Sequence, residues 1–461
     1  MTTGWSRPAA IVVATAFFLE NFDGVVLVTA SPAIARDFGV AAADVGLAST
    51  AYLLAVAVFI PVSGWAADRW GARRVFCAAI AVFALASLLC SLSTGVGQLV
   101  AARVVQGIGG SMMVPVGRLI VLRETDKRDL LRAVAFLTWP ALVAPVVAPL
   151  AGGLITQYLG WPWIFSLNLP LGLLLFGAAM RFVPPVAPVA GRTLDLRGLV
   201  GVSVTLVSLV LGLERLSAPG GPGTAAALLA VALVAATATV LWLSRTRHPF
   251  LDLSTFRIPT FRVTNSSGVW YRAAVSAVPF LLPLLMQEGF GFSPLLAGTM
   301  VMALFAGNLA IKPATSWLIG ALGFGPVMIA SALGVAATLV VCALMPADTP
   351  LWVMGLVFGL SGVFRSTGFT AYGTVQFADV GVDRMPAATT LSATLVQVAA
   401  GLGVALAAVA VRLAPGEEST PEPYRWALVV VAGLAAASCV GAVRLPPGVA
   451  EEVRRGGSRR A

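Results

Sequence analysis

The sequence has few of the residues that build metal centres and disulfide frameworks. It contains a single histidine, His248, and four cysteines, Cys77, Cys90, Cys342 and Cys439, in 461 residues. Each cysteine lies in an apolar stretch, and the His and Cys positions lack the spacing of a metal-ligand set. We therefore expect no metal, no disulfide and no bound cofactor.

Charge is also scarce. Charged residues make up 11% of the chain and hydrophobic residues 58%, with a mean hydropathy of +0.92. A water-soluble domain could not cover this much apolar surface. Apolar runs recur that are long enough to cross the roughly 30 Å hydrocarbon core of a bilayer as helices, which takes about 20 residues each. The sequence therefore predicts an all-α membrane protein.

The candidate spans number fourteen, which would put both ends of the chain on one side of the membrane. They begin near Pro8, Asp44, Val75, Gln98, Leu130, Trp163, Arg197, Gly223, Arg262, Leu295, Gly323, Pro350, Pro386 and Tyr424. The first span contains two acidic residues and has no small-residue cleavage pattern ahead of them, so we interpret it as a retained helix and not as a signal peptide. A short interfacial helix is expected at 248–261.

Lysine and arginine are distributed unevenly between the two sets of loops. The side that holds the termini takes Arg69, Arg73, Arg74, Arg123, Lys127, Arg128, Arg132, Arg181, Arg192, Arg197, Arg245, Arg247 and several C-terminal arginines. The other side has Arg36, Arg215, Arg412 and Arg425, and its last loop carries Glu417, Glu418 and Glu422. Positive residues mark cytoplasmic loops, so both termini are predicted to be cytoplasmic. This also explains the net charge of +10 without a nucleic-acid partner.

Ionisable residues inside the spans cost several kcal/mol each unless they are paired or line a wet cavity. Glu20 and Asp23 in the first span are three residues apart, so both carboxyl groups lie on one side of the helix. Desolvation and mutual repulsion favour a shared proton, as a proton-coupled carrier requires. The alternative is a structural ion pair with Arg103, Arg272 or Arg365.

Further polar residues lie in later spans. Arg103, Gln106, Gly107 and Gly110 follow helical spacing and form one face, which we expect to point inward. Arg272 lies in the ninth span, and Arg365 in the twelfth is expected to line an interior cavity. For Lys312 in the tenth span, snorkelling to the interface and a functional role remain open.

The loop between the second and third spans, "GWAADRWGARR", resembles the signature cytoplasmic loop of the major facilitator superfamily. The residues in register are Gly64, Asp68, Arg69, Gly71 and Arg73, while Ala72 replaces a usual arginine. The resemblance implies a conformational latch, in which Asp68 and the arginines form charge-assisted bonds in one state and release them in the other.

Other segments resemble the fourteen-spanner drug/proton antiporter branch of this superfamily. "RVVQGIGGS" is similar to its conserved-arginine motif, which links Arg103 to proton coupling. "APVVAPLAGG" is similar to the antiporter motif and keeps Pro149, Gly152 and Gly153, although alanines replace some of its glycines. In the first span Asp23 and Pro32 keep the spacing of the branch. The resemblance covers essentially the whole chain.

The resemblance implies two six-helix bundles, at 1–184 and 249–445, with two extra transmembrane helices at 185–248 and a cytoplasmic tail at 446–461. It further implies a secondary transporter in the cytoplasmic membrane. The expected function is export of small lipophilic, cationic compounds in exchange for protons, with the proton gradient as energy source and no obligate protein partner. The alternative is a carrier of an anionic metabolite, peptide or lipid, because Arg103, Arg272, Lys312 and Arg365 make the interior positive. An intramembrane enzyme is disfavoured, since no catalytic motif is found.

Overall fold

The structure is a computed structural model, and it describes residues 7–123, 125, 130–185, 194–216, 222–246, 249–381, 384–416 and 420–443. The predictions for His248, the loop residues Lys127, Arg128, Arg192 and Arg247, the loop glutamates Glu417 and Glu418, and the tail therefore lie outside the described residues. Within the described residues the fold is all-α. The predicted fold class is confirmed.

Helices α1 to α7 form one bundle, which we call the N-bundle. Its helices are α1 (Arg7–Phe38), α2 (Ala42–Trp70), α3 (Ala72–Ser91), α4 (Val96–Arg123), α5 (Leu130–Tyr158), α6 (Trp163–Ser166) and α7 (Asn168–Phe182). The pair α8 (Leu196–Arg215) and α9 (Pro222–Arg245) follows, and these two helices pack on each other.

The remaining helices form the C-bundle. They are the 3₁₀ helix η1 (Leu253–Arg257), α10 (Pro259–Leu284), the π-helical turn η2 (Leu285–Gly289), α11 (Pro294–Ala310), α12 (Lys312–Leu322), α13 (Phe324–Leu344), α14 (Leu351–Val375), α15 (Met385–Leu413), α16 (Glu422–Ala437) and α17 (Cys439–Val443). Helix η1 lies in the segment where a short interfacial helix was predicted. The Asp252 side chain caps it by accepting from the Ser254 amide.

Proline sets the start of many of these helices. Helices α10, α11, α12, α15 and α16 each have proline in their first turn. Proline is favourable there because the first backbone N–H groups of a helix have no intrahelical acceptor and the proline ring already holds a helical φ. Ser293 adds a side-chain cap to α11 by accepting from the Leu296 amide at 3.2 Å.

Among the described residues, thirteen helices are long and apolar enough to cross a membrane, and the count reaches up to fourteen if the bent pair α11 and α12 forms one span. Their starts agree with the predicted spans to within a few residues. The axes of α11 and α12 differ by 52° at the break around Ile311. Pro313 accounts for the break, since it has no N–H to donate to the preceding turn.

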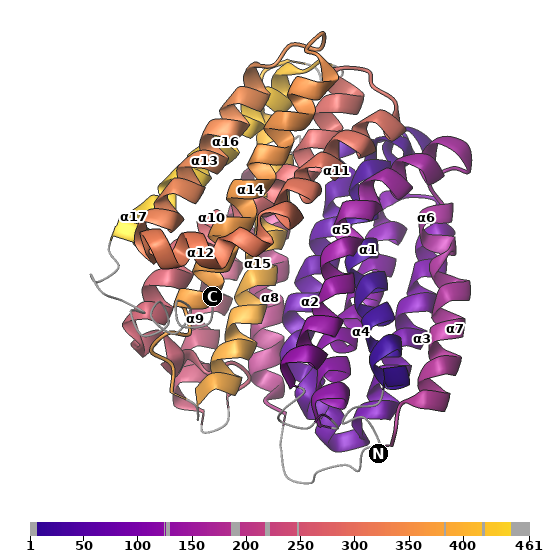
Figure 1. Ribbon diagram of the computed structural model, residues 1–461, viewed down its shortest axis with the longest axis vertical. Helices are drawn as coiled ribbons and strands as arrows, with labels where there is room; N and C mark the ends of the chain where they lie inside the picture. The colour runs from indigo at the N-terminus through magenta and orange to yellow at the C-terminus, as the bar shows by residue number, and fades with distance from the viewer. Residues whose placement is uncertain are drawn as a thin grey trace.

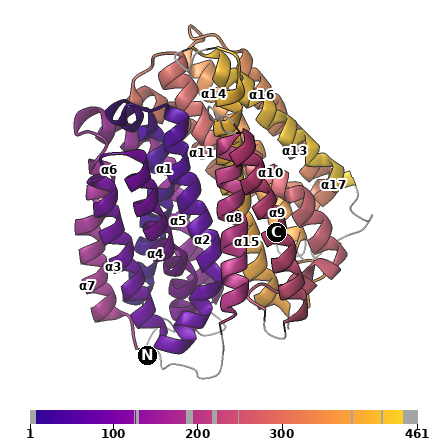
Figure 2. The same ribbon diagram turned by 180° about the vertical axis from the view of Figure 1, so that it is seen from behind.

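The two bundles meet along α2 and α15 on one side and along α5 and α11 on the other. Figure 1 shows α11 crossing α5 near the top of the molecule, while α1 begins near the bottom. Figure 2 shows α8 lying between α2 and α15 on the opposite face. Buried residues of α8, including Leu206 and Val210, belong to one cluster with Leu54 of α2 and Leu391 of α15. Helix α8 of the extra pair therefore covers the seam between α2 and α15.

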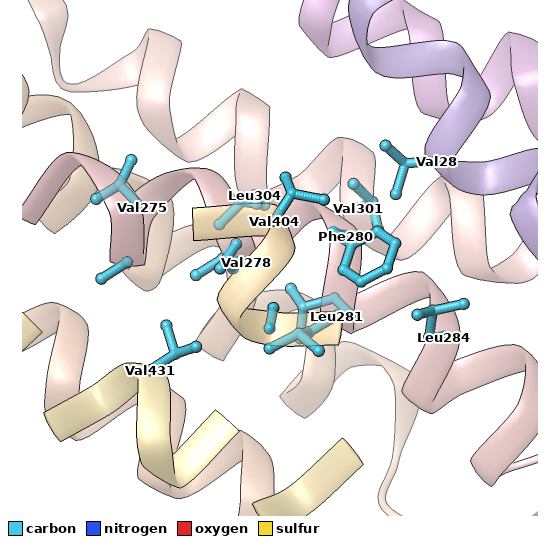
Figure 3. Packing of buried hydrophobic residues seen from close by; sticks show 14 of the residues in the cluster. Val28, Val275, Val278, Phe280, Leu281, Leu284, Val301, Leu304, Val404 and Val431 are labelled. Atoms are coloured by element: carbon cyan, nitrogen blue, oxygen red, sulfur yellow. The ribbon is translucent and has the colours of Figure 1, made fainter. Parts of the chain in front are cut away.

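A large apolar cluster joins the two bundles near the end of the molecule at which α1 ends and α2 begins. We call this the closed end. The cluster contains Val28 of α1, Phe280 of α10 and Val301 of α11, which are drawn in Figure 3. Lipid tails are as apolar as these side chains, so close packing and polar contacts hold the helices together more than the hydrophobic effect does.

Candidate functional site

The centre of the N-bundle holds a buried ion pair. The Arg103 Nη1 atom on α4 lies 2.5 Å from Asp23 Oδ2 on α1, and both side chains are completely buried. The guanidinium group also lies over the Tyr52 ring of α2, with 4.2 Å between Cζ and the ring centroid. The ion pair anticipated as an alternative for the acidic residues is thus formed by Asp23.

Two amide side chains donate to Asp23, and a serine accepts from both of them. The Asp23 Oδ1 atom accepts from Gln106 Nε2 at 3.0 Å and from Asn168 Nδ2 at 2.8 Å. Both amides also donate to Ser87 Oγ, at 3.2 and 2.8 Å. The Gln106 Oε1 atom accepts from Arg103 Nη1 at 2.7 Å. We call these five residues, Asp23, Ser87, Arg103, Gln106 and Asn168, the N-bundle network. The network pairs the two opposite charges and satisfies both carboxylate oxygens of Asp23, while Arg103 Nε and Nη2 are buried without a hydrogen-bond partner.

Glu20 lies one turn before Asp23 and has a different environment. Its Oε1 atom accepts from Tyr52 Oη at 3.3 Å and its Oε2 atom from Asn21 Nδ2 at 3.0 Å. Both donors are neutral, and no cation of the described residues forms an ion pair with this carboxyl group. Glu20 is half-buried, in contrast to Asp23. It is therefore a partly accessible intramembrane carboxyl group held by neutral donors.

The glycines of α4 allow this arrangement. A methyl group at Gly107 would lie 2.7 Å from the Tyr52 carbonyl oxygen, and one at Gly110 would lie 2.9 Å from the Tyr52 hydroxyl. The absence of side chains at these positions lets α4 approach α2 and leaves space for Tyr52 between Arg103 and Glu20. Residues predicted to share one face of the fourth span thus surround Tyr52.

Arg272 lies apart from the N-bundle network, in the C-bundle. Its Nη1 atom donates to Asn265 Oδ1 at 2.9 Å and its Nη2 atom to Gln376 Oε1 at 3.3 Å, and the residue is 2% exposed. Ser392 donates to the same Gln376 oxygen at 2.8 Å. The buried guanidinium group of Arg272 therefore donates to two side-chain amide oxygens.

Arg365 on α14 and Lys312 at the start of α12 are likewise separate from the N-bundle network. The Arg365 guanidinium lies over the Phe305 ring, with 4.9 Å between Cζ and the centroid, and its Nη1 atom is buried without a hydrogen-bond partner. The Lys312 Nζ atom donates to Thr370 Oγ1 at 3.1 Å. Both side chains are half-buried.

The residues of the predicted latch gather at the junction of α2 and α3. Gly71 connects the two helices with a φ of 87°, a left-handed conformation that favours glycine. The Arg73 guanidinium donates to the Met180 carbonyl of α7, while Gly64 and Arg69 are exposed and Asp68 is half-buried. In this conformation Arg73 therefore connects the loop to a helix of its own bundle.

The residues of the predicted antiporter motif lie where α5 meets α1 and α11. A methyl group at Gly153 would lie 2.5 Å from the Pro294 carbonyl oxygen, and one at Gly152 would lie 2.8 Å from Val26 Cγ2. A methyl group at Gly298 of α11 would in turn lie 2.2 Å from the Pro149 carbonyl oxygen. Two backbones from different bundles are thus in direct contact at the closed end.

Polar contacts between the bundles also gather at the closed end. Arg36 pairs with Glu288 at 3.2 Å, and Arg412 pairs with Asp44 at 2.7 Å. The Gln287 Nε2 atom donates to the Thr29 carbonyl at 2.9 Å. The closed end is therefore sealed by ion pairs and backbone contacts as well as by apolar packing.

A family model described as Major Facilitator Superfamily matches residues 13–271 and 264–460, which together cover almost the whole chain. The chain belongs to the major facilitator superfamily. The resemblance predicted from the motifs is confirmed, and the chain is a transporter and not an enzyme.

Curated relatives within the superfamily carry the name "Putative multidrug resistance protein MdtD". The protein from Pectobacterium carotovorum subsp. carotovorum (strain PC1) is 33% identical over 400 residues, or 86% of this chain and 85% of the relative. That from Escherichia coli O139:H28 (strain E24377A / ETEC) is 33% identical over 399 residues, or 86% and 84%. Among solved structures, the POT family transporter PepTSo is similar to this chain with a TM-score of 0.70 and 12% sequence identity. The superposition covers 100% of both chains and supports the facilitator fold alone.

Several residues of the site were not predicted from the sequence. The surroundings of Asp23 and Glu20 include three such residues, Tyr52, Ser87 and Asn168. Each of them lies in a span that has no charged residue in its middle, so a rule that selects intramembrane charges does not find it. Asn168 carried the strongest available signal, since an amide in the apolar run "SLNLPLG" requires a polar partner. The facilitator fold brings these residues from α2, α3 and α7 onto α1.

Proposed function

We propose that this facilitator exports small lipophilic, cationic compounds across the cytoplasmic membrane in exchange for protons. The relatives named as multidrug resistance proteins support a broad substrate range. The observation that carries the proposal is Glu20, a half-buried carboxyl group inside the membrane that accepts only from the neutral donors Tyr52 and Asn21. Such a group can change its ionisation without leaving a buried cation unpaired.

Glu20 is the main proton carrier in this proposal, and Asp23 is a supporting residue. Asp23 already has a guanidinium and two amide donors, so protonating it would leave Arg103 buried without a counter-charge. Glu20 has no such constraint. Arg103 and Gln106 hold Asp23, and Tyr52 connects their cluster to Glu20 through its ring and hydroxyl group.

Alternating access couples the proton to the substrate. The proposal takes the closed end as the outer side and the side of the termini as cytoplasmic, in line with the distribution of arginines. Deprotonated Glu20 then attracts a cation from the cytoplasm. Protonation from the outside, in the state opened at the closed end, releases it. The two states need differ in proton affinity by only a few kcal/mol.

The experiment measures proton-driven efflux of a lipophilic cation, such as ethidium, from proteoliposomes that contain Glu20→Gln. We expect efflux to fall to background because glutamine cannot exchange a proton, while the protein still folds. Glu422→Gln is the matched control, since Glu422 is an exposed glutamate at the closed end and should leave efflux unchanged. Full proton-driven efflux by a folded Glu20→Gln protein would refute the assignment.

An anionic substrate is the second candidate, and one observation favours it. Among the described residues, the side chains of Arg272, Lys312 and Arg365 in the C-bundle contact neutral groups. Saturable transport of a fluorescent organic anion, inhibited by other organic anions and not by organic cations, in proteoliposomes that do not export ethidium would favour this candidate.

A further inference from the structure

The helices of the C-bundle, as far as the structure describes them, contain cations in their interior but no carboxylate to neutralise them. In helices α10 to α17 with η2, the acidic residues are Glu288 and Glu422. Both lie at the closed end, where Glu288 pairs with Arg36 and Glu422 with Arg425. Arg365 lies fourteen residues along α14 from that end, or about 21 Å. In the described loops next to α14, Asp348 precedes the helix at the closed end and Asp379 follows it, fourteen residues beyond Arg365. The described helices of the bundle therefore have no acidic side chain near Arg365.

The carboxyl groups in the interior of the N-bundle already have partners within that bundle. Asp23 is paired with Arg103, and Glu20 accepts from Tyr52 and Asn21. Cations inside a membrane are normally paired with an acid, with backbone carbonyls or with water in a cavity. Arg365 and Lys312 thus lack a counter-charge among the described residues.

The Arg365 side chain has an unused hydrogen-bond donor that a ligand could occupy. Its guanidinium is fixed over the Phe305 ring, its Nη1 atom is buried without a partner, and the side chain as a whole is only half-buried. Lys312 reaches the same helix at Thr370, five residues from Arg365, or about 7.5 Å along the axis. Residues five apart on a helix point to different sides, so Lys312 contacts α14 more than one turn from Arg365 and on another side of the helix.

We infer that Arg365 forms a subsite for an oxyanion, such as the carboxylate of a lipophilic organic acid, and that Lys312 adds positive charge to the same end of the bundle. A planar guanidinium group binds a carboxylate through paired N–H donors, and an ammonium group adds a second charge. Arg272 is not part of this subsite, because the amide oxygens of Asn265 and Gln376 accept from its terminal nitrogens. The identification of the oxyanion as cargo rests on the proposed transport function.

The subsite extends the substrate class. Glu20 in the N-bundle suits a positive group and Arg365 in the C-bundle suits a negative one. Lipophilic molecules with a carboxylate, alone or together with an amine, therefore belong to the class of ligands this protein binds.

The test is thermal unfolding of the purified full-length protein with two probes that share one ring system, 2-naphthoate and 2-naphthylmethylamine, at 0.15 M chloride. We expect naphthoate to raise the Tm, since a ligand that binds the folded state stabilises it. Arg365→Gln should raise the apparent Kd of naphthoate about tenfold or more, Lys312→Gln should raise it by a smaller factor, and both should leave that of the amine unchanged. Arg365→Lys should retain part of the effect.

The matched control is Arg36→Gln, which removes an arginine that already has a carboxylate partner and should not alter naphthoate binding. Absence of a naphthoate shift in the wild-type protein, or equal shifts in the wild-type and Arg365→Gln proteins, would overturn the inference. A shift seen only without chloride would also overturn it, because the site would then hold an inorganic ion. The assay uses no proton gradient, so its outcome is independent of proton-driven efflux.

Discussion

At the scale of single residues, two carboxyl groups one turn apart on α1 have opposite surroundings. Asp23 is fully buried against a guanidinium, whereas Glu20 is half-buried against a phenol and an amide. Sequence spacing places both groups on one side of the helix but does not distinguish them. The distinction arises from Arg103 of α4 and Tyr52 of α2.

A stability prediction follows for the buried pair. Asp23→Asn should destabilise the protein by about 3–5 kcal/mol, because it leaves the Arg103 charge buried without a carboxylate. The double variant Asp23→Asn with Arg103→Gln should lose less than the sum of the single changes. Unfolding midpoints of the three variants, measured at one pH in one detergent, check this. Strict additivity would show that the pair is not energetically coupled.

At the scale of secondary-structure elements, glycines decide how closely α5 and α11 approach. Gly153 faces the Pro294 carbonyl and Gly298 faces the Pro149 carbonyl, so in each case the obstacle to a side chain is backbone and cannot rotate away. The antiporter motif thus occupies the contact between two bundles that must separate for the closed end to open.

Gly153→Ala should shift the conformational equilibrium away from the closed state. The added methyl group would cost about 1–3 kcal/mol, a factor of about 5 to 150 in the ratio of closed to open molecules. Labelling of Val28→Cys by an impermeant maleimide added at the closed end reports opening, since Val28 is 7% exposed within the interbundle cluster. The protein without the introduced cysteine gives the background.

Gly355→Ala on α14 is the matched control for that experiment, because a methyl group there would meet nothing within 4 Å. Its labelling rate should equal that of the parent. Equal rates for Gly153→Ala and the parent would show that the contact between α5 and α11 does not hold the end closed.

At the scale of the whole molecule, ion pairs at the closed end join the bundles. Arg412 and Asp44 connect α15 to α2, on the side that α8 covers, and Arg36 and Glu288 connect α1 to η2. They are partly exposed, so each should contribute less than about 1 kcal/mol, or about fivefold in the conformational ratio. They bias the equilibrium without locking it, as a transport cycle requires.

The charge exchange Asp44→Arg with Arg412→Asp tests this bias. Asp44→Arg alone should increase Val28→Cys labelling, because it places two like charges together. The exchanged pair should return the rate toward that of the parent. Failure of the exchange to restore labelling, in a protein that folds normally, would show that the pair is not a determinant of closure.

The sequence by itself determined the helical membrane fold, the position of nearly every span and the family. These properties depend on composition along the chain: apolar length, proline at helix starts and glycine motifs in loops are local signals. The sequence also identified Glu20, Asp23, Arg103, Gln106, Arg272, Lys312 and Arg365, since an ionisable or amide side chain in an apolar run stands out by itself.

Only the tertiary structure decided which of these residues meet. It joined Asp23 with Arg103, left Glu20 with neutral donors and placed Arg365 without an acid, although all are charges in apolar runs. The physical reason is that partners come from different helices, and the rotation and depth of each helix are set by side-chain packing across the bundle. The bend between α11 and α12 and the covering of one seam by α8 likewise depend on contacts between distant segments.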